Sequence, residues 1–276
     1  MGTHFVIDCG SRSIKLHEAA PGAVSLCATR SWDPINDARH AGRVGELLAD
    51  LTRDLPTRSG IHVVGTAAAR RDPHVAEAIH AACAALGWSY ETLSHEAEAA
   101  LIREAFGGVA GCDIVNAGGG SIQIVTSTGV ALLPFGISDL NRDFGLNRDA
   151  ADRRVAAATA FVRDRLPRLD RPFIYSGGEL SYLRALGAML GDGGFCTAEE
   201  FSRVAAWVDG MATGELERYS PFDAGWCSGA VASNAIVRAC LEQCGCGYYY
   251  ASDVNIADGI ISSLAGRSQH AAHAGL

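Results

Sequence analysis

Apolar and polar positions recur along the chain with two periods, which predict strands and helices in turn. Apolar or alternating runs predict strands in a hairpin at 3–16 and at Val24–Trp32, Ile61–Val64, Tyr90–Leu93, Asp113–Val125, Gly129–Leu133, 173–176 and 248–253. Apolar positions three to four residues apart predict helices within Asp37–Leu55, His74–Gly87, Ser94–Phe106, Asn141–Leu166, Glu199–Tyr219, Ala224–Leu241 and Asn255–Leu264. The alternation predicts an α/β architecture with mostly parallel connections.

One apolar run is broken by three consecutive glycines. In Asp113–Val125 the segment Gly118–Gly120 is followed by Ser121, which predicts a strand, a tight turn and a second strand. Glycines have no Cβ, so backbone N–H groups can approach a ligand closely and form a concavity suited to phosphate oxygens. For a single turn of this kind, a plain β-hairpin is the preferred interpretation.

The same pattern occurs a second time near the N-terminus, at 3–16. At a constant offset the matching pairs are Asp8 with Asn116, Gly10 with Gly118, Ser13 with Ser121, Ile14 with Ile122 and Lys15 with Gln123. The repeat predicts two related domains, 1–108 and 109–276, each opening with a phosphate-binding hairpin. Whether the final helix packs back on the first domain is left open. Paired hairpins can also be purely architectural.

Composition and charge narrow the function. A chain of 276 residues with 48% hydrophobic side chains is long enough for two modest domains with full cores. The net charge of -8 argues against sequence-independent binding of nucleic acid. The only lysine, Lys15, lies beside the first hairpin. The chain opens without a secretory signal pattern and has no apolar run of about 18 residues, so we expect a cytoplasmic protein without a membrane partner.

Nine cysteines in such a chain predict reduced thiols. Cys240, Cys244 and Cys246 form a C-x3-C-x-C cluster, but no second pair with zinc-site spacing follows. A packed cluster at a helix end is therefore favoured over a metal site.

Two further stretches carry polar residues next to predicted strands. Thr66 and Arg70 follow the strand Ile61–Val64 and could donate to a phosphate, although an ordinary turn with exposed arginines explains them equally well. Ser94 is a candidate N-cap, and Glu98 lies in the first turns of the helix that follows. A carboxylate favoured by the helix dipole explains Glu98 without any further role.

In their order these landmarks resemble the exopolyphosphatase/guanosine pentaphosphate phosphohydrolase family, a branch of the actin-like ATPase superfamily. The matching stretches are 7–16, Thr66–Arg70, 93–102, Gly118–Ser121, Ser176–Gly178 and 251–261.

The resemblance implies two ribonuclease-H-like domains with a central interdomain cleft and the active site between them. It implies that Glu98 is the general base and that Asp8 places a magnesium ion. The phosphate-binding residues that the resemblance implies are Gly10, Ser11, Arg12, Ser13, Lys15, Thr66, Arg70, Gly118, Gly119, Gly120, Ser121, Ser176, Gly177 and Gly178. The substrate would be a small phosphorylated molecule, and a homodimer is left open.

The chain departs from the family pattern at four positions. Asn116 and Gln123 stand where the family has Asp and Glu, Asp139 stands near a basic position, and His95 replaces a glycine. Amide oxygens are weak metal ligands, so the first two changes predict weakened magnesium binding.

Three functions follow from these observations. The preferred one is a phosphohydrolase that removes a terminal phosphate from a metabolite, nucleotide or short polyphosphate. The alternatives are a phosphate- or nucleotide-binding protein without metal chemistry, and a small-molecule kinase.

Overall fold

The computed structural model describes residues 4–20, 23–37, 39–55, 60–107, 111–222 and 225–263. These residues form two compact units. The first contains 4–107 together with 255–263, and the second contains 111–254. The last described segment therefore belongs with the N-terminal part of the chain.

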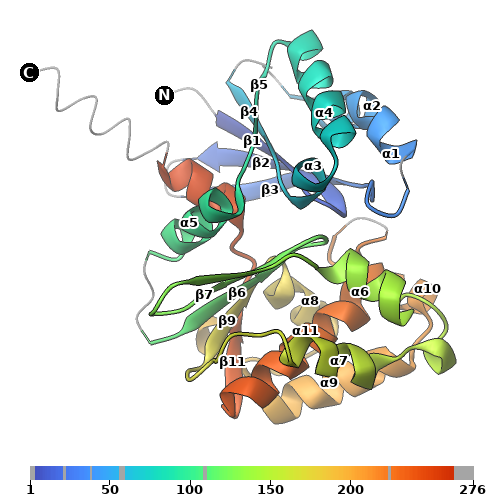
Figure 1. Ribbon diagram of the computed structural model, residues 1–276, viewed down its shortest axis with the longest axis vertical. Coiled ribbons are helices and arrows are strands. Elements are labelled where there is room, and N and C mark those ends of the chain that lie inside the picture. Colours follow the sequence, from blue (N-terminus) through green and yellow to red (C-terminus); the bar gives the residue numbers. More distant parts are fainter. Residues whose placement is uncertain are drawn as a thin grey trace, which may run out of the picture. The chain divides into compact units, whose positions relative to one another are not determined.

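A five-stranded mixed sheet forms the centre of the first unit (Figure 1). In sheet order its strands are β3 (Ala23–Ser31), β2 (Ser13–Ala20), β1 (His4–Cys9), β4 (Ile61–Gly65) and β5 (Ser89–Thr92). Strands β1, β2 and β3 pair antiparallel, whereas β4 runs parallel to β1 and β5 parallel to β4. The carboxyl ends of β1 and β4 therefore lie side by side.

Helices cover both faces of this sheet (Figure 1). They are α1 (Arg39–Gly42), α2 (Val44–Leu51), α3 (Ala67–Arg71), α4 (Pro73–Leu86), α5 (His95–Ala105) and the helical residues 256–263. Buried Phe5, Ile7 and Cys9 of β1 share a core with Leu48 of α2 and Ile79 of α4. Because side chains alternate along a strand, Asp8 points to the opposite face.

The second unit has a six-stranded mixed sheet. Its strands in order are β10 (Phe195–Thr197), β11 (Tyr248–Ala251), β9 (Phe173–Ser176), β6 (Asp113–Ala117), β7 (Ile122–Val125) and β8 (Val130–Leu133). Strands β11, β9 and β6 are parallel, and the remaining pairs are antiparallel.

The helices of this unit pack on one face of the sheet to form a single hydrophobic core. They are α6 (Ile137–Phe144), α7 (Val155–Arg163), α8 (Glu179–Ala185), α9 (Ala198–Gly210), α10 (Thr213–Leu216) and α11 (Ala230–Cys244), with 3-10 turns at Ala150–Asp152, Asp192–Gly194, Glu217–Tyr219 and Trp226–Gly229. Val115 of β6 and Ile122 of β7 are fully buried in this core. Asn116 and Gln123 alternate with them and occupy the other face.

The α/β class is confirmed, but the expectation of mostly parallel connections is wrong. Strands joined by tight turns, such as β1 and β2, must pair antiparallel, and each sheet contains a meander of three such strands. The sequence did not predict the short strand β10 or the short helices α3 and α8, and it placed the start of α6 four residues too late. The residues around the expected domain boundary, 108–110, and the tail 266–276 lie outside the described residues.

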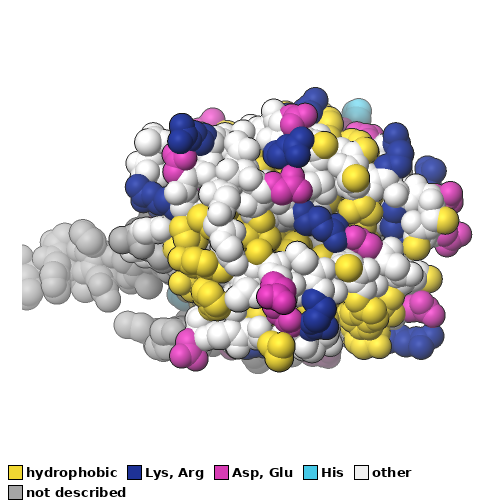
Figure 2. All heavy atoms as spheres, turned by 90° about the horizontal axis from the view of Figure 1, so that it is seen from below, with side chains coloured by type: hydrophobic (Ala, Val, Ile, Leu, Met, Phe, Trp, Pro, Cys, Tyr) yellow, Lys and Arg dark blue, Asp and Glu magenta, His cyan; other side chains and the backbone are white. Residues whose placement is uncertain are grey.

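All nine cysteines are free thiols, as predicted. In the described ranges no helix is long and apolar enough to cross a membrane. On the face drawn in Figure 2, acidic and basic side chains are interspersed, with hydrophobic side chains between them.

Candidate functional site

The turn between β1 and β2 is closed by a backbone hydrogen bond. Gly10 N donates to Ser13 O at 3.0 Å, and Asp8 faces Lys15 across the two strands. Ser11 at the turn is only 3% exposed, and its hydroxyl has no hydrogen-bond partner among the residues that the structure describes. A buried polar atom without a partner is costly, so this hydroxyl is suited to receive a ligand.

Asp8 is a buried carboxyl at the end of β1. It is 9% exposed, and within the described residues its Oδ1 has no hydrogen-bond partner. Burial raises the pKa of Asp8 to about 6, and the nearby Lys15 charge only partly opposes this shift. A partner that stabilises the ionised form, such as a cation, would therefore bind Asp8 favourably.

Glu98 on α5 forms the second buried carboxyl of this unit. It is 5% exposed, and Arg70 Nη1 lies 2.8 Å from its Oε2. The same Nη1 donates to Leu93 O at 2.8 Å, which fixes the guanidinium between the end of β5 and α5. Burial raises the pKa of Glu98 to about 7 despite the Arg70 charge, and the Asp8 charge adds to the rise. Asp8 and Glu98 therefore interact within one unit.

The N-terminal cap of α5 helps to fix the position of Glu98. Ser94 accepts a hydrogen bond from Ala97 N at 3.1 Å and so begins the helix, as its sequence predicts. Glu98 lies in the first turn of this helix and is buried. His95 is partly buried, and burial together with the charges of Arg70 and Arg71 lowers its pKa.

Thr66 joins this group from the end of β4. Its side chain is buried, its N donates to Cys9 O at 3.3 Å, and its O accepts from Arg70 N at 3.0 Å. The end of β4 is thus bonded to the end of β1 on one side and to α3 on the other. This places Thr66 and Arg70 beside the first hairpin.

The turn between β6 and β7 repeats the geometry of the first hairpin. Gly118 N donates to Ser121 O at 2.9 Å, and Asn116 faces Gln123 across the strands. The start of α6 packs on this turn, because Ile137 N donates to Gly118 O at 3.0 Å and Ser138 N to Gly119 O at 2.8 Å.

A chain of side-chain hydrogen bonds runs beneath this second turn. Ser176 Oγ donates to Asn116 Oδ1 at 3.0 Å, Asn116 Nδ2 to Gln123 Oε1 at 2.8 Å, and Gln123 Nε2 to Ser121 Oγ at 2.9 Å. All four side chains are buried. Neutral amides thus bond to each other where two carboxylates would repel one another.

Gly177 and Gly178 connect β9 to α8. Both have a positive φ, 105° and 108°, a conformation that favours glycine. Glu179, directly after them, is buried and accepts a hydrogen bond from Tyr249 Oη at 2.7 Å. Burial raises the pKa of Glu179 to about 7.

Comparisons with known proteins agree with this geometry. Residues 46–206, more than half of the chain, match the Ppx/GppA phosphatase family. The chain belongs to the Ppx/GppA phosphatase family. No curated protein matches the sequence. The match leaves out the first hairpin and the last helix.

Solved structures of this family extend the agreement to almost the whole chain. The Aquifex aeolicus Ppx/GppA family member is 18% identical with a TM-score of 0.67, and the alignment covers 97% of this chain and 99% of that one. An exopolyphosphatase from Cytophaga hutchinsonii is 13% identical with a TM-score of 0.77, and the alignment covers 95% and 97% of the two chains. At these identities the similarity establishes a shared fold.

The structure separates the expected site residues into two groups. The first unit brings together Asp8, Gly10, Ser11, Arg12, Ser13, Lys15, Thr66, Arg70 and Glu98, and the second brings together Asn116, Gly118, Gly119, Gly120, Ser121, Gln123, Ser176, Gly177 and Gly178. Their roles in binding and catalysis stay predictions.

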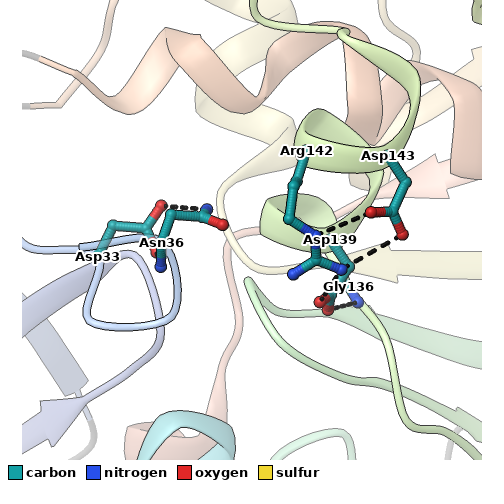
Figure 3. A network of polar contacts seen from close by, with 6 residues as sticks. All are labelled: Asp33, Asn36, Gly136, Asp139, Arg142 and Asp143. Carbon is teal, nitrogen blue, oxygen red and sulfur yellow. Dashed lines mark hydrogen bonds and ion pairs between the residues drawn. The ribbon is translucent and has the colours of Figure 1, made fainter. Parts of the chain in front are cut away.

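Asp139, which stands near a basic position of the family pattern, caps a helix here. Its Oδ2 accepts a hydrogen bond from Gly136 N at 2.9 Å, and its Oδ1 lies 3.2 Å from Arg142 Nη2 (Figure 3). Arg142 also pairs with Asp143. The cap fixes the start of α6 against the glycine turn.

Trp32 is the main residue that sequence reasoning missed. It follows β3 directly, is 1% exposed, and donates from Nε1 to Gly10 O at 2.6 Å. The sequence signal was a large aromatic residue at the end of a predicted strand, followed by polar residues. In the structure these polar residues form a turn in which Asn36 Nδ2 donates to Asp33 Oδ2 at 2.9 Å (Figure 3).

The residues of the first unit fit a magnesium ion better than those of the second. Within the described residues no group of three or more His, Cys, Asp or Glu side chains is arranged to hold a metal. Magnesium needs only one or two carboxylates because it keeps several waters. Asp8, with its buried oxygen, meets that need. The oxygens of Asn116 and Gln123 already accept hydrogen bonds.

Proposed function

We propose that this protein is a phosphohydrolase that removes the terminal phosphate of a small phosphorylated metabolite, nucleotide or short polyphosphate. Membership of the Ppx/GppA phosphatase family supports the reaction class. The observation that carries the proposal is the group of Glu98, Arg70 and Asp8 beside a tight glycine turn.

Glu98 is suited to act as the general base. A base works best when its pKa lies near the working pH, and burial raises the pKa of Glu98 to about 7. Glu98 would take a proton from water while the water oxygen bonds to the terminal phosphorus. The bond from that phosphorus to its bridging oxygen breaks, and the bridging oxygen keeps the electron pair.

Other residues of the first unit would position the reactants. Arg70 orients the Glu98 carboxylate through the 2.8 Å ion pair, and is itself held by Leu93 O. Lys15, Arg12 and the turn at Gly10 would offset phosphate charge. Asp8 would hold a magnesium ion, which when bound neutralises charge on the phosphates.

The test is phosphate release from a panel of nucleotides, sugar phosphates and short polyphosphates. We expect Glu98→Gln to lower kcat by at least about 100-fold, the usual contribution of a general base. Glu96→Gln is the matched control, since Glu96 lies on the same first turn but is exposed. Equal release by wild type and Glu98→Gln would remove Glu98 from the mechanism.

The pH profile gives an independent readout of the same proposal. The base is active when ionised, so kcat/KM should rise with pH through about 7, where the pKa of Glu98 lies. A profile that is flat from pH 5.5 to 8.5 would contradict the assignment.

The amide chain beneath the second turn favours a second candidate, a phosphate-binding protein without turnover. Asn116 and Gln123 bond to each other and need no cation to balance them. This candidate predicts tripolyphosphate binding that persists with a chelator present, and no phosphate release from any substrate.

A further inference from the structure

The two hairpins differ in the group that holds the first carbonyl of the turn. In the second unit Gly118 O accepts a hydrogen bond from Ile137 N at 3.0 Å. In the first unit the corresponding carbonyl, Gly10 O, accepts from Trp32 Nε1 at 2.6 Å. A side chain therefore does for one turn what the start of a helix does for the other.

Trp32 forms two hydrogen bonds with the first turn. Its indole nitrogen donates to Gly10 O, and its backbone N donates to Arg12 O at 3.0 Å. The two carbonyls lie on either side of Ser11, whose buried hydroxyl has no hydrogen-bond partner within the described part of the chain. Fixing both neighbouring carbonyls fixes the peptide planes that carry the N–H groups of Ser11 and Ser13.

We propose that Trp32 is a positioning residue that holds the Gly10–Ser13 turn in the conformation that binds the phosphate of the substrate. The assignment rests on the proposed function, in which this turn receives a phosphate group. Trp32 itself does not touch the substrate; its indole acts through the backbone of Gly10.

Trp88 provides a matched control. Trp32 and Trp88 are buried in the same hydrophobic core, 1% and 7% exposed. The indole nitrogen of Trp88 has no hydrogen-bond partner within the described ranges. Replacing either by Phe removes a similar amount of core packing, but only Trp32→Phe removes a bond to the turn. The backbone bond from residue 32 to Arg12 O remains in that variant.

The experiment measures tripolyphosphate binding by calorimetry and hydrolysis by phosphate release. We expect Trp32→Phe to weaken binding and raise KM about tenfold, because the loosened turn must be ordered when the phosphate binds, with kcat changed by less than about threefold. Amide exchange at Gly10 and Ser13 should accelerate in Trp32→Phe. Trp88→Phe should lower the melting temperature less, because it breaks no hydrogen bond, and should leave Kd, KM and exchange at the turn unchanged.

The outcomes separate this proposal from the proposed function. Equal changes of Kd in the two variants, or unchanged exchange at the turn in Trp32→Phe, would overturn the role of Trp32. Binding that depends on Trp32 without any hydrolysis by wild type would uphold Trp32 and overturn the phosphohydrolase. A wild-type protein that neither binds tripolyphosphate nor releases phosphate from any member of the substrate panel would overturn both.

A second measurement covers the case in which Trp32→Phe does not fold. In the 15N-labelled wild-type protein, the indole signal of Trp32 can be assigned by replacing Trp88, Trp207 and Trp226 in turn by Phe. Tripolyphosphate should shift the Trp32 indole signal, because its acceptor is part of the turn that binds the anion. An unchanged signal at saturation would overturn the proposal.

Discussion

Asp8 and Asn116 occupy the same position in two hairpins of the same register, but they are stabilised in different ways. Asp8 has a buried oxygen without a partner among the described residues, and burial raises its pKa to about 6. Both polar atoms of the Asn116 side chain form hydrogen bonds, the oxygen with Ser176 and the nitrogen with Gln123. A cation would therefore stabilise Asp8, whereas the hydrogen bonds of Asn116 are complete without one.

Restoring a carboxylate at the second position should create a need for a cation. In Asn116→Asp the amide donor to Gln123 is lost and a buried carboxylate takes its place. We expect the free energy of unfolding to fall by about 1–3 kcal/mol without magnesium, the cost of a buried unsatisfied group, and to recover partly when magnesium is added. Thermal unfolding with and without magnesium measures this.

Asn147→Asp serves as the control, because Asn147 is exposed. Its melting temperature should not respond differently to magnesium from that of wild type. If Asn116→Asp likewise shows no magnesium response, the second hairpin has no capacity for a cation.

At the scale of elements, each turn is held by the segment that follows the third strand of its meander. In the second unit this segment is the start of α6, which lies so close to the turn that only glycine fits. A Cβ at residue 136 would lie well inside van der Waals contact of Gly118 O and Gly119 O. The turn and the helix therefore move as one piece.

Gly136→Ala tests this close contact. We expect it to destabilise the protein by about 2 kcal/mol or more, because the helix must shift away from the turn and lose bonds to Gly118 O and Gly119 O. Gly129→Ala is the control, since a Cβ there meets nothing within 4 Å. Thermal unfolding of the two variants measures the difference, and equal melting temperatures would contradict the contact.

A second glycine contact connects the last described helix to the helix that carries Glu98. A Cβ at Gly259 would lie well inside van der Waals contact of Leu101 O of α5. Ser263 Oγ donates to Glu104 Oε2 at 2.7 Å and reinforces the pairing. The position of α5, and with it of Glu98, thus depends on residues more than 150 positions later in the chain.

Gly259→Ala should therefore affect both stability and activity. We expect a loss of about 2 kcal/mol in the free energy of unfolding, and a lower kcat as Glu98 moves relative to Arg70. Ser262→Ala is the control on the exposed side of the same helix. Unfolding and phosphate release measure the two effects. A stable Gly259→Ala variant with normal kcat would show that this helix does not position α5.

For the whole molecule, the sequence supported the class of fold and the order of elements better than their pairing. Periodicity located α4 and α5 within one residue at either end, since caps such as Ser94 mark helix ends locally. Strand direction was misjudged because each sheet contains a three-stranded antiparallel meander of consecutive strands, which the overall alternation of strands and helices does not reveal. The group of residues around Glu98 was predicted from the order of motifs shared with the family. The hydrogen bond of Trp32 could not be predicted, because it joins a side chain to a carbonyl 22 residues away.

Buried titratable groups set the pH dependence of the stability of the whole chain. Burial raises the pKa of Glu179 and of Glu98 from 4.5 to about 7, and that of Asp8 from 3.8 to about 6. Between the unfolded and folded values, the folded chain holds protons that the unfolded chain releases, so stability falls as pH rises. His17 acts oppositely below pH 6.5, because burial lowers its pKa to about 3. Three carboxyls outweigh one imidazole, so stability should decline from about pH 5 to 7.

Glu179 allows this balance to be tested away from the candidate catalytic residues. It faces the hydroxyl of Tyr249, and the charge of Asp253 adds to the rise in its pKa. Glu179→Gln keeps the acceptor oxygen and removes the ionisation. The variant should match wild type near pH 4.5 and exceed it at pH 8 by on the order of 2 kcal/mol. Urea unfolding at both pH values measures this, with the exposed Glu215→Gln as the control. Parallel stability curves for wild type and Glu179→Gln would show that Glu179 ionises in the folded chain as readily as in the unfolded one.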